Sequence, residues 1–539
     1  MKQELVRLIA SALKKAQLEE ISSWSINKSP QKKFGDYATN VALIAAEYAK
    51  KKPREVAQMI AENIPLVDSR KLIEKVEIAG PGFINLFVSH EYLYKILNQV
   101  IQQGPGYGKS KVGEGRRVLL EFVSANPTGP LHIGHGRWAA IGDSLANILD
   151  AAGFKTSREF YVNDRGKQIQ LLVESVKART ENRAIPDGGY GGEYVKHLAA
   201  RVRVGGTFSP VETLNFILEG QKQTLENLHV KFDHWFSEQE MHAKGEVQEA
   251  LELLKKLKHT YEKEGALWFK STDFGDDKDR VLVKSDGELT YFASDVAYHM
   301  DKYKRGFDHI INIFGADHHG YVARLKAAVQ GLGFDVSRFE VIIGQLVSLY
   351  RGKEQVRVSK RTGEMITLEE VIEEIGIDAA RYFLIMRGAD THLDFDLELA
   401  KKTTLDNPVY YVQYAHARIC SIFREAADRG YKALVRAQNF ALVRTQDFAF
   451  LTDESELDLI RKIADFPDEI AEAALARLPH RLTTYVQELV TIFHSYYHKC
   501  RVLGDDKELS CARLALCEAT RIVIKNTLNL LGVSAPDKM

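Results

Sequence analysis

Hydrophobic and polar residues follow mixed helical and strand-like patterns up to about residue 405 and mostly helical patterns after it. Apolar residues recur at helical spacing in YATNVALIAAEYAKK, and VEIAGPGFINLFVS alternates like two strands joined by a Gly-Pro-Gly turn. A stretch rich in glycine and basic residues, 104–117, predicts a boundary. The first 110 residues are therefore expected to form an α+β domain.

The next segment reads as strand, tight loop, helix and strand. VLLEFVS predicts a strand over 118–124, a helix is expected over 133–151, and TSREFYVND predicts the next strand. This order is typical of a parallel sheet. We predict a doubly wound, Rossmann-like core over 111–365, interrupted by a largely helical insertion at about 164–279.

The second half of this core is expected to open with a hairpin, RVLVKSDGELTYF, that turns at Asp286-Gly287. The helix SDVAYHMDKYKR, the strand HIINIFG, the helix GYVARLKAAVQGLG and the strand FEVIIGQLV follow. A charged loop, YRGKEQVRVSKRTGEM, leads into connecting helices over 366–404. Residues 405–539 are expected to form an all-α domain, and deleting them should leave the α/β core folded.

Composition indicates a large soluble protein and little more. A chain of 539 residues is too long for one core, and its 45% hydrophobic and 27% charged residues are ordinary for a globular protein. Lysine plus arginine balance aspartate plus glutamate at 73 each, which neither supports nor excludes a nucleic-acid partner. No apolar run approaches the ~20 residues of a membrane span. The amphipathic N-terminus carries acidic residues and is expected to be the first helix of the mature protein, not a transit peptide.

The four cysteines make no CxxC pair and lie in apolar, helical surroundings. This usage is typical of reduced thiols in a cytoplasmic protein, and it predicts no zinc site.

Two segments carry candidate chemistry for nucleotide phosphates. ANPTGPLHIGH follows the first strand of the core, where ligands of open α/β sheets bind, and the next helix directs its positive end there. His132 and His135 could donate to phosphate oxygens, or they could be ordinary capping residues. VSKRTGE, 358–364, could be a solvated charge run or a clamp in which Lys360 is the point charge. Together the two segments favour a nucleotide site.

These motifs also carry a resemblance. HIGH, at 132–135, with RVSKR, at 357–361, resembles the paired signatures of class I aminoacyl-tRNA synthetases. The strings EFVSANPTGPLHIGHGR, YVNDRGKQI, LTYFASDVAYH, FGADHHGYVARLKAA and GIDAARYF are similar to the arginyl-tRNA synthetase family, as are FGDYATNVA near the N-terminus and NPVYYVQYAHAR near the C-terminus. Arg357 and Val358 stand where the basic signature usually has lysine and methionine.

The resemblance implies that arginine is activated by ATP and then transferred to the terminal adenosine of tRNA(Arg). It implies that the N-terminal domain contacts tRNA and that residues 405–539 bind the anticodon. Mg²⁺ on the phosphates, a monomeric protein and activation that requires bound tRNA are further expectations.

The same resemblance assigns site residues. Catalysis would involve His132, Gly134, His135 and Lys360. ATP would contact Thr128, Gly129, His132, His135, Gly315, Asp317, Ser359, Lys360 and Arg361. Arginine would contact Glu121, Ser124, Asn126, His135, Tyr291, Asp295 and His318. Asp317 and His318 belong to a DHH triplet, which could also hold a metal, but no further ligand pattern lies nearby and no metal site is expected.

Residue chemistry supports part of this assignment. Glu121 lies in an apolar strand, where an isolated carboxylate is costly unless paired, although an edge-strand glutamate facing water would avoid that cost. Tyr291 and Asp295 are four residues apart and could face one pocket. Two carboxylates and a phenol suit a guanidinium, which presents five donors in a fixed fork.

Two alternative functions would leave different marks on the sequence. Another class I synthetase or a small nucleotidyltransferase would lack the paired RNA-contacting domains and would not need Tyr291 with Asp295. A non-catalytic tRNA-binding relative should have lost HIGH or Lys360, and both are present.

The two motifs give a first prediction. His135→Ala and Lys360→Ala should each slow adenylate formation by on the order of 10²–10³, because both side chains act on charge that grows toward the transition state. Single-turnover activation measures the rate, and arginine affinity should change far less. Near-normal activation in either variant would show that its role is assigned wrongly.

Overall fold

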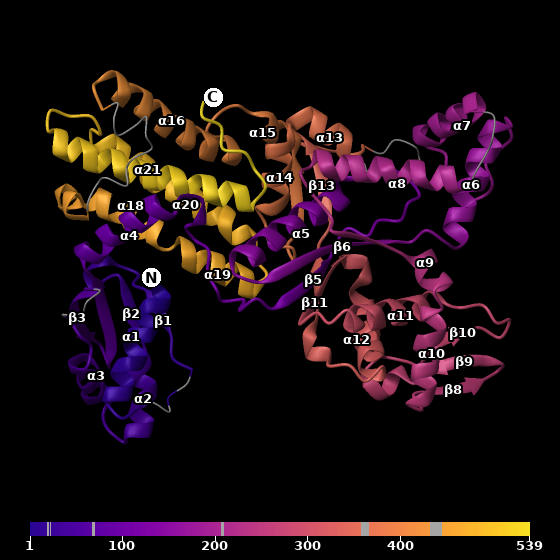
Figure 1. Ribbon diagram of the computed structural model, residues 1–539, viewed down its shortest axis with the longest axis horizontal. Coiled ribbons are helices and arrows are strands. Elements are labelled where there is room, and N and C mark those ends of the chain that lie inside the picture. The colour runs from indigo at the N-terminus through magenta and orange to yellow at the C-terminus, as the bar shows by residue number, and fades with distance from the viewer. Residues whose placement is uncertain (19–20, 22, 67–70, 206–209, 357–365, 432–444) are drawn as a thin grey trace.

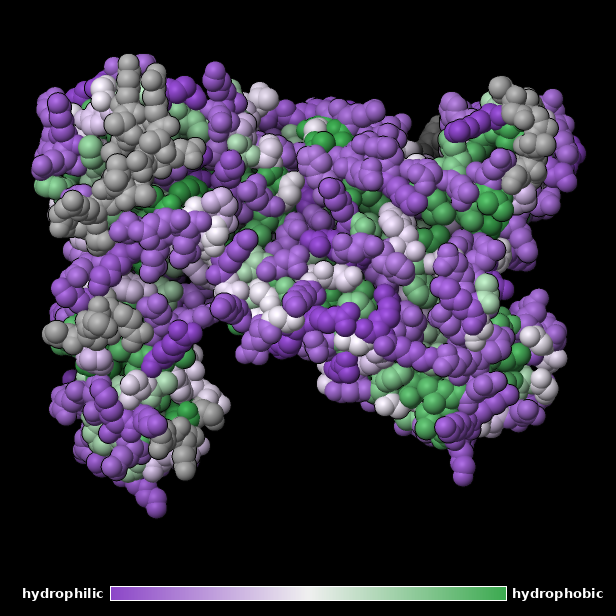
Figure 2. Space-filling model, viewed as in Figure 1, coloured by the Kyte–Doolittle hydropathy of each residue, from purple (hydrophilic) through white to green (hydrophobic). Residues whose placement is uncertain are grey.

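The computed structural model describes residues 1–18, 21, 23–66, 71–205, 210–356, 366–431 and 445–539. Figure 1 shows the α/β core at the centre, the N-terminal domain below the helical C-terminal domain on one side, and two smaller lobes on the other side. Hydrophilic residues cover most of the face seen in Figure 2. Within the described ranges, no helix has the length and apolar character needed to cross a membrane.

The N-terminal domain is an antiparallel four-stranded sheet covered by helices. Strand order is β1-β2-β4-β3. The predicted pair of strands around Gly-Pro-Gly is confirmed as β3, Ile73–Ala79, and β4, Phe83–Val88. The remaining elements are α1 (Lys2–Lys15), β1 (Ile26–Lys28), β2 (Tyr37–Thr39), α2 (Val41–Ala49), α3 (Pro53–Glu62) and α4 (His90–Gln103).

The core is a five-stranded, fully parallel sheet in the order β12-β11-β5-β6-β7, which confirms the predicted doubly wound class. β5 lies in the middle, so Glu121 at its end is not on an edge strand. The strands and their main helices are β5 (Arg117–Glu121), α5 (Ile133–Ala151), β6 (Lys155–Val162), β7 (His234–Ser237), α11 (Tyr291–Lys304), β11 (His309–Gly315), α12 (Val322–Gly331) and β12 (Phe339–Gly344).

Helix α5 packs unusually close to this sheet. It has the predicted bounds, and most of its residues are buried, Arg137 and Asp143 among them. A side chain at Gly142 would come within 2.3 Å of the Phe122 ring. The absence of a side chain at Gly142 therefore lets the helix approach the end of β5, and this approach holds the first turn of α5 at the sheet's carboxyl edge.

The structure contains several short strands that the sequence analysis did not predict. The segment expected to be a largely helical insertion does contain α6 (Lys167–Thr180), α7 (Glu193–Gly205), α8 (Pro210–Asn227), α9 (Glu238–Ala243) and α10 (Glu246–Lys256), but β7 returns to the main sheet within it. β8 (Thr260–Lys263), β9 (Ala266–Phe269) and β10 (Arg280–Val283) form a separate antiparallel sheet. Strands of four residues are too short to give a clear period-2 pattern.

Two other local predictions were right only in part. The chain does turn back at Asp286-Gly287, and backbone hydrogen bonds join Lys284 to Glu288 at 2.8 Å and Thr290 to Leu282 at 3.0 Å. The second strand of this hairpin is reduced to one bridge, Val283 to Leu289, because Thr290 caps α11 and the helix begins at Tyr291. The start of the charged loop is ordered as β13, Val347–Arg351, and β14, Glu354–Val356, which join β15, Leu393–Asp396, in a three-stranded sheet. The connecting helices are α13 (Leu368–Ile375), α14 (Ile377–Ile385) and α15 (Leu397–Lys401).

The C-terminal region is helical, as predicted, in the residues that the structure describes. Its α-helices are α16 (Pro408–Asp428), α18 (Glu454–Ala464), α19 (Phe466–Ala476), α20 (His480–Lys499) and α21 (Lys507–Leu530). The FGDY segment of the N-terminal domain contacts it: the Tyr37 hydroxyl donates to Asp465 at 3.1 Å, and Asp36 pairs with Arg461 at 2.7 Å.

One hydrophobic core runs through all three parts, so the expectation of an independently folding α/β core does not fit the packing. The cluster includes Leu5 of α1, Leu145 of α5 and Leu528 of α21. The buried guanidinium of Arg381, in α14, donates to the carbonyl of Leu531 at 2.9 Å and to the carboxylate of Asp143. Removal of the C-terminal domain would expose apolar surface, and the buried guanidinium of Arg381 would lose its contact with Leu531.

The continuous core gives a second prediction. Deleting residues 406–539 should lower the melting temperature of the remaining chain or make it insoluble, because burial of apolar surface contributes about 25 cal/mol per Å². Circular dichroism measures the transition, with the full-length chain as reference. A truncated chain that melts at the full-length temperature would show that the domains are energetically independent.

Candidate active site

A cavity of about 820 Å³ opens at the carboxyl ends of the parallel strands. It is bordered by the ends of β5 and β11, by the first turn of α5, by α11 and by the segment after β12. The sequence-predicted residues that line it are Glu121, Ser124, Asn126, His132, Gly134, His135, Asp295, Gly315, Asp317 and His318. A deep polar cavity at this edge is where open α/β sheets bind ligands.

Backbone strain marks the point where β5 enters the cavity. Val123 and Ser124 have φ of +70° and +39°, a left-handed conformation that is costly for a β-branched residue such as valine. The bend brings the Ser124 hydroxyl to Glu121, to which it donates at 2.9 Å, and Ser124 also accepts from the backbone N–H of Tyr161 at 3.1 Å. The strained turn therefore fixes the carboxylate of Glu121 in place.

Glu121 is already paired within the protein. Its other carboxylate oxygen accepts from Lys302, whose ammonium group is fully buried and also donates to Asn312 at 2.9 Å. Glu121 is therefore paired, as expected for a carboxylate in an apolar strand, and its partner is Lys302. Because a compensated carboxylate attracts a second cation less strongly, Glu121 is a weaker guanidinium partner than the sequence indicated.

Asp295 has a different environment. Its carboxylate accepts from the Tyr321 hydroxyl, and among the described residues no lysine, arginine or histidine forms an ion pair with it. Burial raises the pKa of Asp295 to about 7, with a further rise from the carboxylates of Glu238 and Glu121. The side chain lines the cavity. The charge of Arg324 acts on this carboxylate without forming an ion pair, so an ionised Asp295 presents a negative charge to a ligand.

The two histidines of HIGH cap the helix and line the cavity at the same time. His132 Nδ1 accepts from the backbone N–H of Gly134, and His135 Nδ1 accepts from that of His132, both at 3.2 Å. The rings stack with centroids 3.7 Å apart. Since each Nδ1 accepts, the proton of a neutral ring is on Nε2, which makes each Nε2–H a donor. Capping and phosphate binding are thus compatible roles.

Three predicted residues do not line this cavity. Thr128 and Gly129 face the helical lobe, where their carbonyls accept from Tyr194 at 2.7 Å and from Gln221 at 2.9 Å. Tyr291 is 61% exposed at the start of α11, beside Gly166, so it does not share a pocket with Asp295 in this conformation. Ser359, Lys360 and Arg361 lie outside the described residues.

Comparisons with known proteins cover the whole chain. Residues 96–188 and 210–408 match the family model of the class I tRNA synthetase (R) catalytic domain, residues 3–88 match the arginyl-tRNA synthetase N-terminal domain, and residues 412–539 match the DALR anticodon binding domain. The chain belongs to the arginyl-tRNA synthetase family.

Individual relatives agree with the family models. The arginine–tRNA ligase of Heliobacterium modesticaldum is 48% identical over 544 residues, 98% of this chain and 96% of that protein. A structure titled as a putative arginyl-tRNA synthetase from Campylobacter jejuni is 35% identical, has a TM-score of 0.76 and covers 84% of this chain and all of its own. Thermus thermophilus arginyl-tRNA synthetase, at 23% identity, shares the fold over 100% of both chains with a TM-score of 0.77.

Sequence reasoning missed several polar residues around the synthetase site. Lys302, Asn312, His299 and Tyr321 surround the two acidic residues. Lys302 follows Asp295 by two helical turns on α11, so helical spacing alone could have placed both on one face. Tyr321 had no such signal, because it reaches Asp295 from a different segment.

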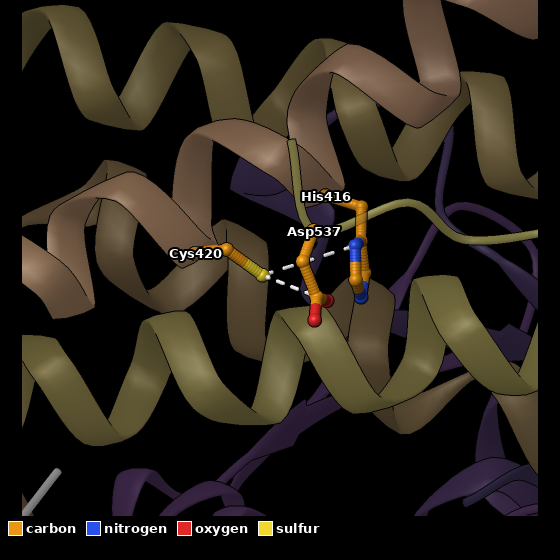
Figure 3. Close-up of side chains that lie close together, drawn as sticks. All are labelled: His416, Cys420 and Asp537. Carbon is orange, nitrogen blue, oxygen red and sulfur yellow. Dashed lines mark hydrogen bonds between the residues drawn. The ribbon is translucent and has the colours of Figure 1, made fainter. Parts of the chain in front are cut away.

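One group of three potential metal ligands lies far from the cavity in sequence, where His416 and Cys420 of α16 meet Asp537 (Figure 3). His416 Nδ1 donates to the carbonyl of Pro536 at 2.9 Å, and the Cys420 thiol donates to Asp537 at 3.5 Å. Burial raises the pKa of Cys420 to about 11, with a further rise from Asp537. A protonated thiol and an occupied imidazole suit a hydrogen-bonded attachment of the C-terminal segment better than a metal centre.

The pKa of Asp295 gives a third prediction. The arginine guanidinium stays charged, so below pH 7 binding must first remove a proton from Asp295. The dissociation constant for arginine should therefore rise as pH falls, approaching about tenfold per pH unit, and level off above pH 7.

Calorimetry between pH 6 and 8.5 measures this dependence, and Asp295→Asn should bind weakly with no slope in this range. A flat wild-type profile would show that Asp295 is not the titrating partner.

Proposed function

We propose that the protein is an arginine–tRNA ligase that activates L-arginine with ATP and transfers it to tRNA(Arg). Family membership supports this proposal, and the observation that carries it is the carboxylate of Asp295, which has no ion-pair partner among the described residues and lines the cavity that HIGH borders. The cavity offers a negative charge for a guanidinium, and it also offers imidazole N–H donors and a helix N-terminus for phosphates.

The first step is proposed as follows. The arginine carboxylate attacks the α-phosphorus of ATP, the bond to the bridging oxygen breaks, and pyrophosphate leaves with that electron pair. His132 and His135 donate from Nε2 to phosphate oxygens, and Lys360 adds a point charge. Gly134 keeps the turn open, since a side chain there would approach the His132 ring at 3.0 Å. The protein contributes positioning and charge, with no covalent intermediate.

Other assignments are part of the same proposal. Asp295 binds the guanidinium, with Tyr291 joining it when the start of α11 moves, and Ser124, Asn126 and His318 surround the amino end of arginine. Glu121 is assigned to position the Ser124 turn rather than to bind the guanidinium directly. Thr128, Gly129, Gly315, Asp317, Ser359 and Arg361 are assigned to the nucleotide side.

Mg²⁺ fits this site. It usually binds through nucleotide phosphates with one or two carboxylates, and the Asp317 carboxylate is exposed where it lines the cavity. When bound, the ion would neutralise charge on the phosphates.

In the second step, the 2′- or 3′-hydroxyl of the terminal adenosine attacks the arginyl carbonyl and AMP leaves. We propose that residues 1–110 and 405–539, which lie on the same side of the core, both contact the tRNA. The protein is proposed to act as a monomer. Cytoplasmic location is proposed from the free thiols of Cys420, Cys500, Cys511 and Cys517.

The activity is tested by ATP–pyrophosphate exchange with each amino acid, with and without tRNA. Exchange that depends on arginine and rises sharply with tRNA supports the proposal. Exchange with a different amino acid, or none under any condition with a folded protein, would contradict it.

A fourth prediction concerns amino-acid choice. Asp295→Asn retains size and one acceptor but removes the charge, and truncating one side of a buried charge pair commonly costs ~2–5 kcal/mol. We expect a raised KM for arginine, little change for ATP, and loss of the preference over citrulline, the uncharged isostere. Glu121→Gln should instead lower the melting temperature, because Lys302 loses its partner.

Competition of arginine against citrulline measures the preference in the wild type and both variants. Unchanged discrimination in Asp295→Asn would show that other residues recognise the guanidinium.

A further inference from the structure

Arg137 is a fully buried charge that the mechanism does not use. It follows His135 by two residues on α5 and has no exposed surface. Among the described residues no carboxylate forms an ion pair with it. A buried guanidinium without a counter-ion is costly, so its surroundings must hold it by other means.

Backbone carbonyls from two segments provide those means. Nη1 donates to Gln345 at 2.8 Å and to Leu346 at 3.4 Å, and Nη2 donates to Gly388 at 2.8 Å and to Thr391 at 2.7 Å. The two segments are also joined directly, through the N–H of Gln345 and the carbonyl of Ala389 at 2.7 Å. The planar guanidinium carries N–H groups on two terminal nitrogens, so it can donate to the carbonyls of both segments at once, which a single ammonium group cannot do.

The next residue of α5 reinforces the same attachment. A side chain at Gly344 would come within 2.0 Å of the Trp138 ring, so the end of β12 lies directly against α5. Leu346 and Val347, which follow, line the cavity, and Leu346 is 63% exposed. Arg137 and Trp138 thus fasten this wall, which we call the 344–347 wall, to the helix whose first turn carries HIGH.

From this geometry we infer that Arg137 is a positioning residue for ATP: it sets the distance between the HIGH turn and the 344–347 wall. This rests on the proposed function, in which His132 and His135 bind the phosphates. The rest of the nucleotide is then placed between these histidines and the 344–347 wall, which Arg137 attaches to the same helix. Arginine should be affected little, because Asp295 is held separately on α11.

Arg137→Lys tests the role while keeping the charge. One ammonium cannot serve both segments, so the wall should shift, and misplacement of a reacting group by about 1 Å can cost up to ~10² in rate. We expect KM for ATP to rise about tenfold and kcat of exchange to fall, with KM for arginine within about threefold of wild type. An inert ATP analogue, titrated by calorimetry, should show the same loss of affinity without any reaction.

Arg381→Lys is the matched control. Arg381 is also fully buried and donates to carbonyls, those of Leu531 and Leu228, but it contacts no residue of the 344–347 wall. It should lower the melting temperature and leave KM for ATP near that of wild type. Gly344→Ala displaces the same wall by collision with Trp138, so it should reproduce the ATP-selective defect if Arg137→Lys fails to fold.

The results separate this inference from the proposed function. Wild-type protein without arginine-dependent exchange would overturn the function itself. Active wild type with an Arg137→Lys variant that binds ATP normally, or that loses ATP and arginine equally, would overturn the positioning role. The same ATP-selective loss in Arg381→Lys would also overturn it, because the effect would then reflect stability alone.

Discussion

A half-buried carboxylate without an ion-pair partner among the described residues, that of Asp295, is the constraint that shapes this site. Two buried carboxylates of the core sheet are neutralised by cations of the chain: Glu121 by Lys302, and Glu159 by Arg305 at 2.6 Å. The hydrogen bonds from His234 and Arg305 outweigh burial and lower the pKa of Glu159 to about 2, whereas burial raises that of Asp295 to about 7. Asp295 lines the cavity, so a bound cation can supply the ion-pair partner that it lacks.

Helix α5 positions the residues that we assign to phosphate binding in the same cavity as Asp295. Its first turn is capped by His132 and His135, its flank fixes the 344–347 wall through Arg137, and its middle joins the C-terminal helices through Asp143 and Arg381. A shift of this helix would move all three together. The continuous core makes such a shift costly, since close-packed interiors transmit strain rather than absorb it.

Long periodic elements could be predicted from the sequence, and short or long-range features could not. Helix α5 and strand β11 have the predicted bounds, because each has a clear period and flanking turn residues. β7 was missed because four residues carry too little pattern. Tyr291 was misplaced because spacing says which residues share a helix face but not where that face points. Helical spacing could place Lys302 on the same face as Asp295, but its contact with Glu121, and that of Tyr321 with Asp295, are tertiary contacts that local patterns do not encode.

A crystal structure with L-arginine bound tests the central claim most directly. We expect a bidentate contact between the guanidinium and the Asp295 carboxylate at about 2.7–2.9 Å, with Glu121 still bonded to Lys302. A guanidinium bound elsewhere, with Asp295 contacting only Tyr321, would contradict it.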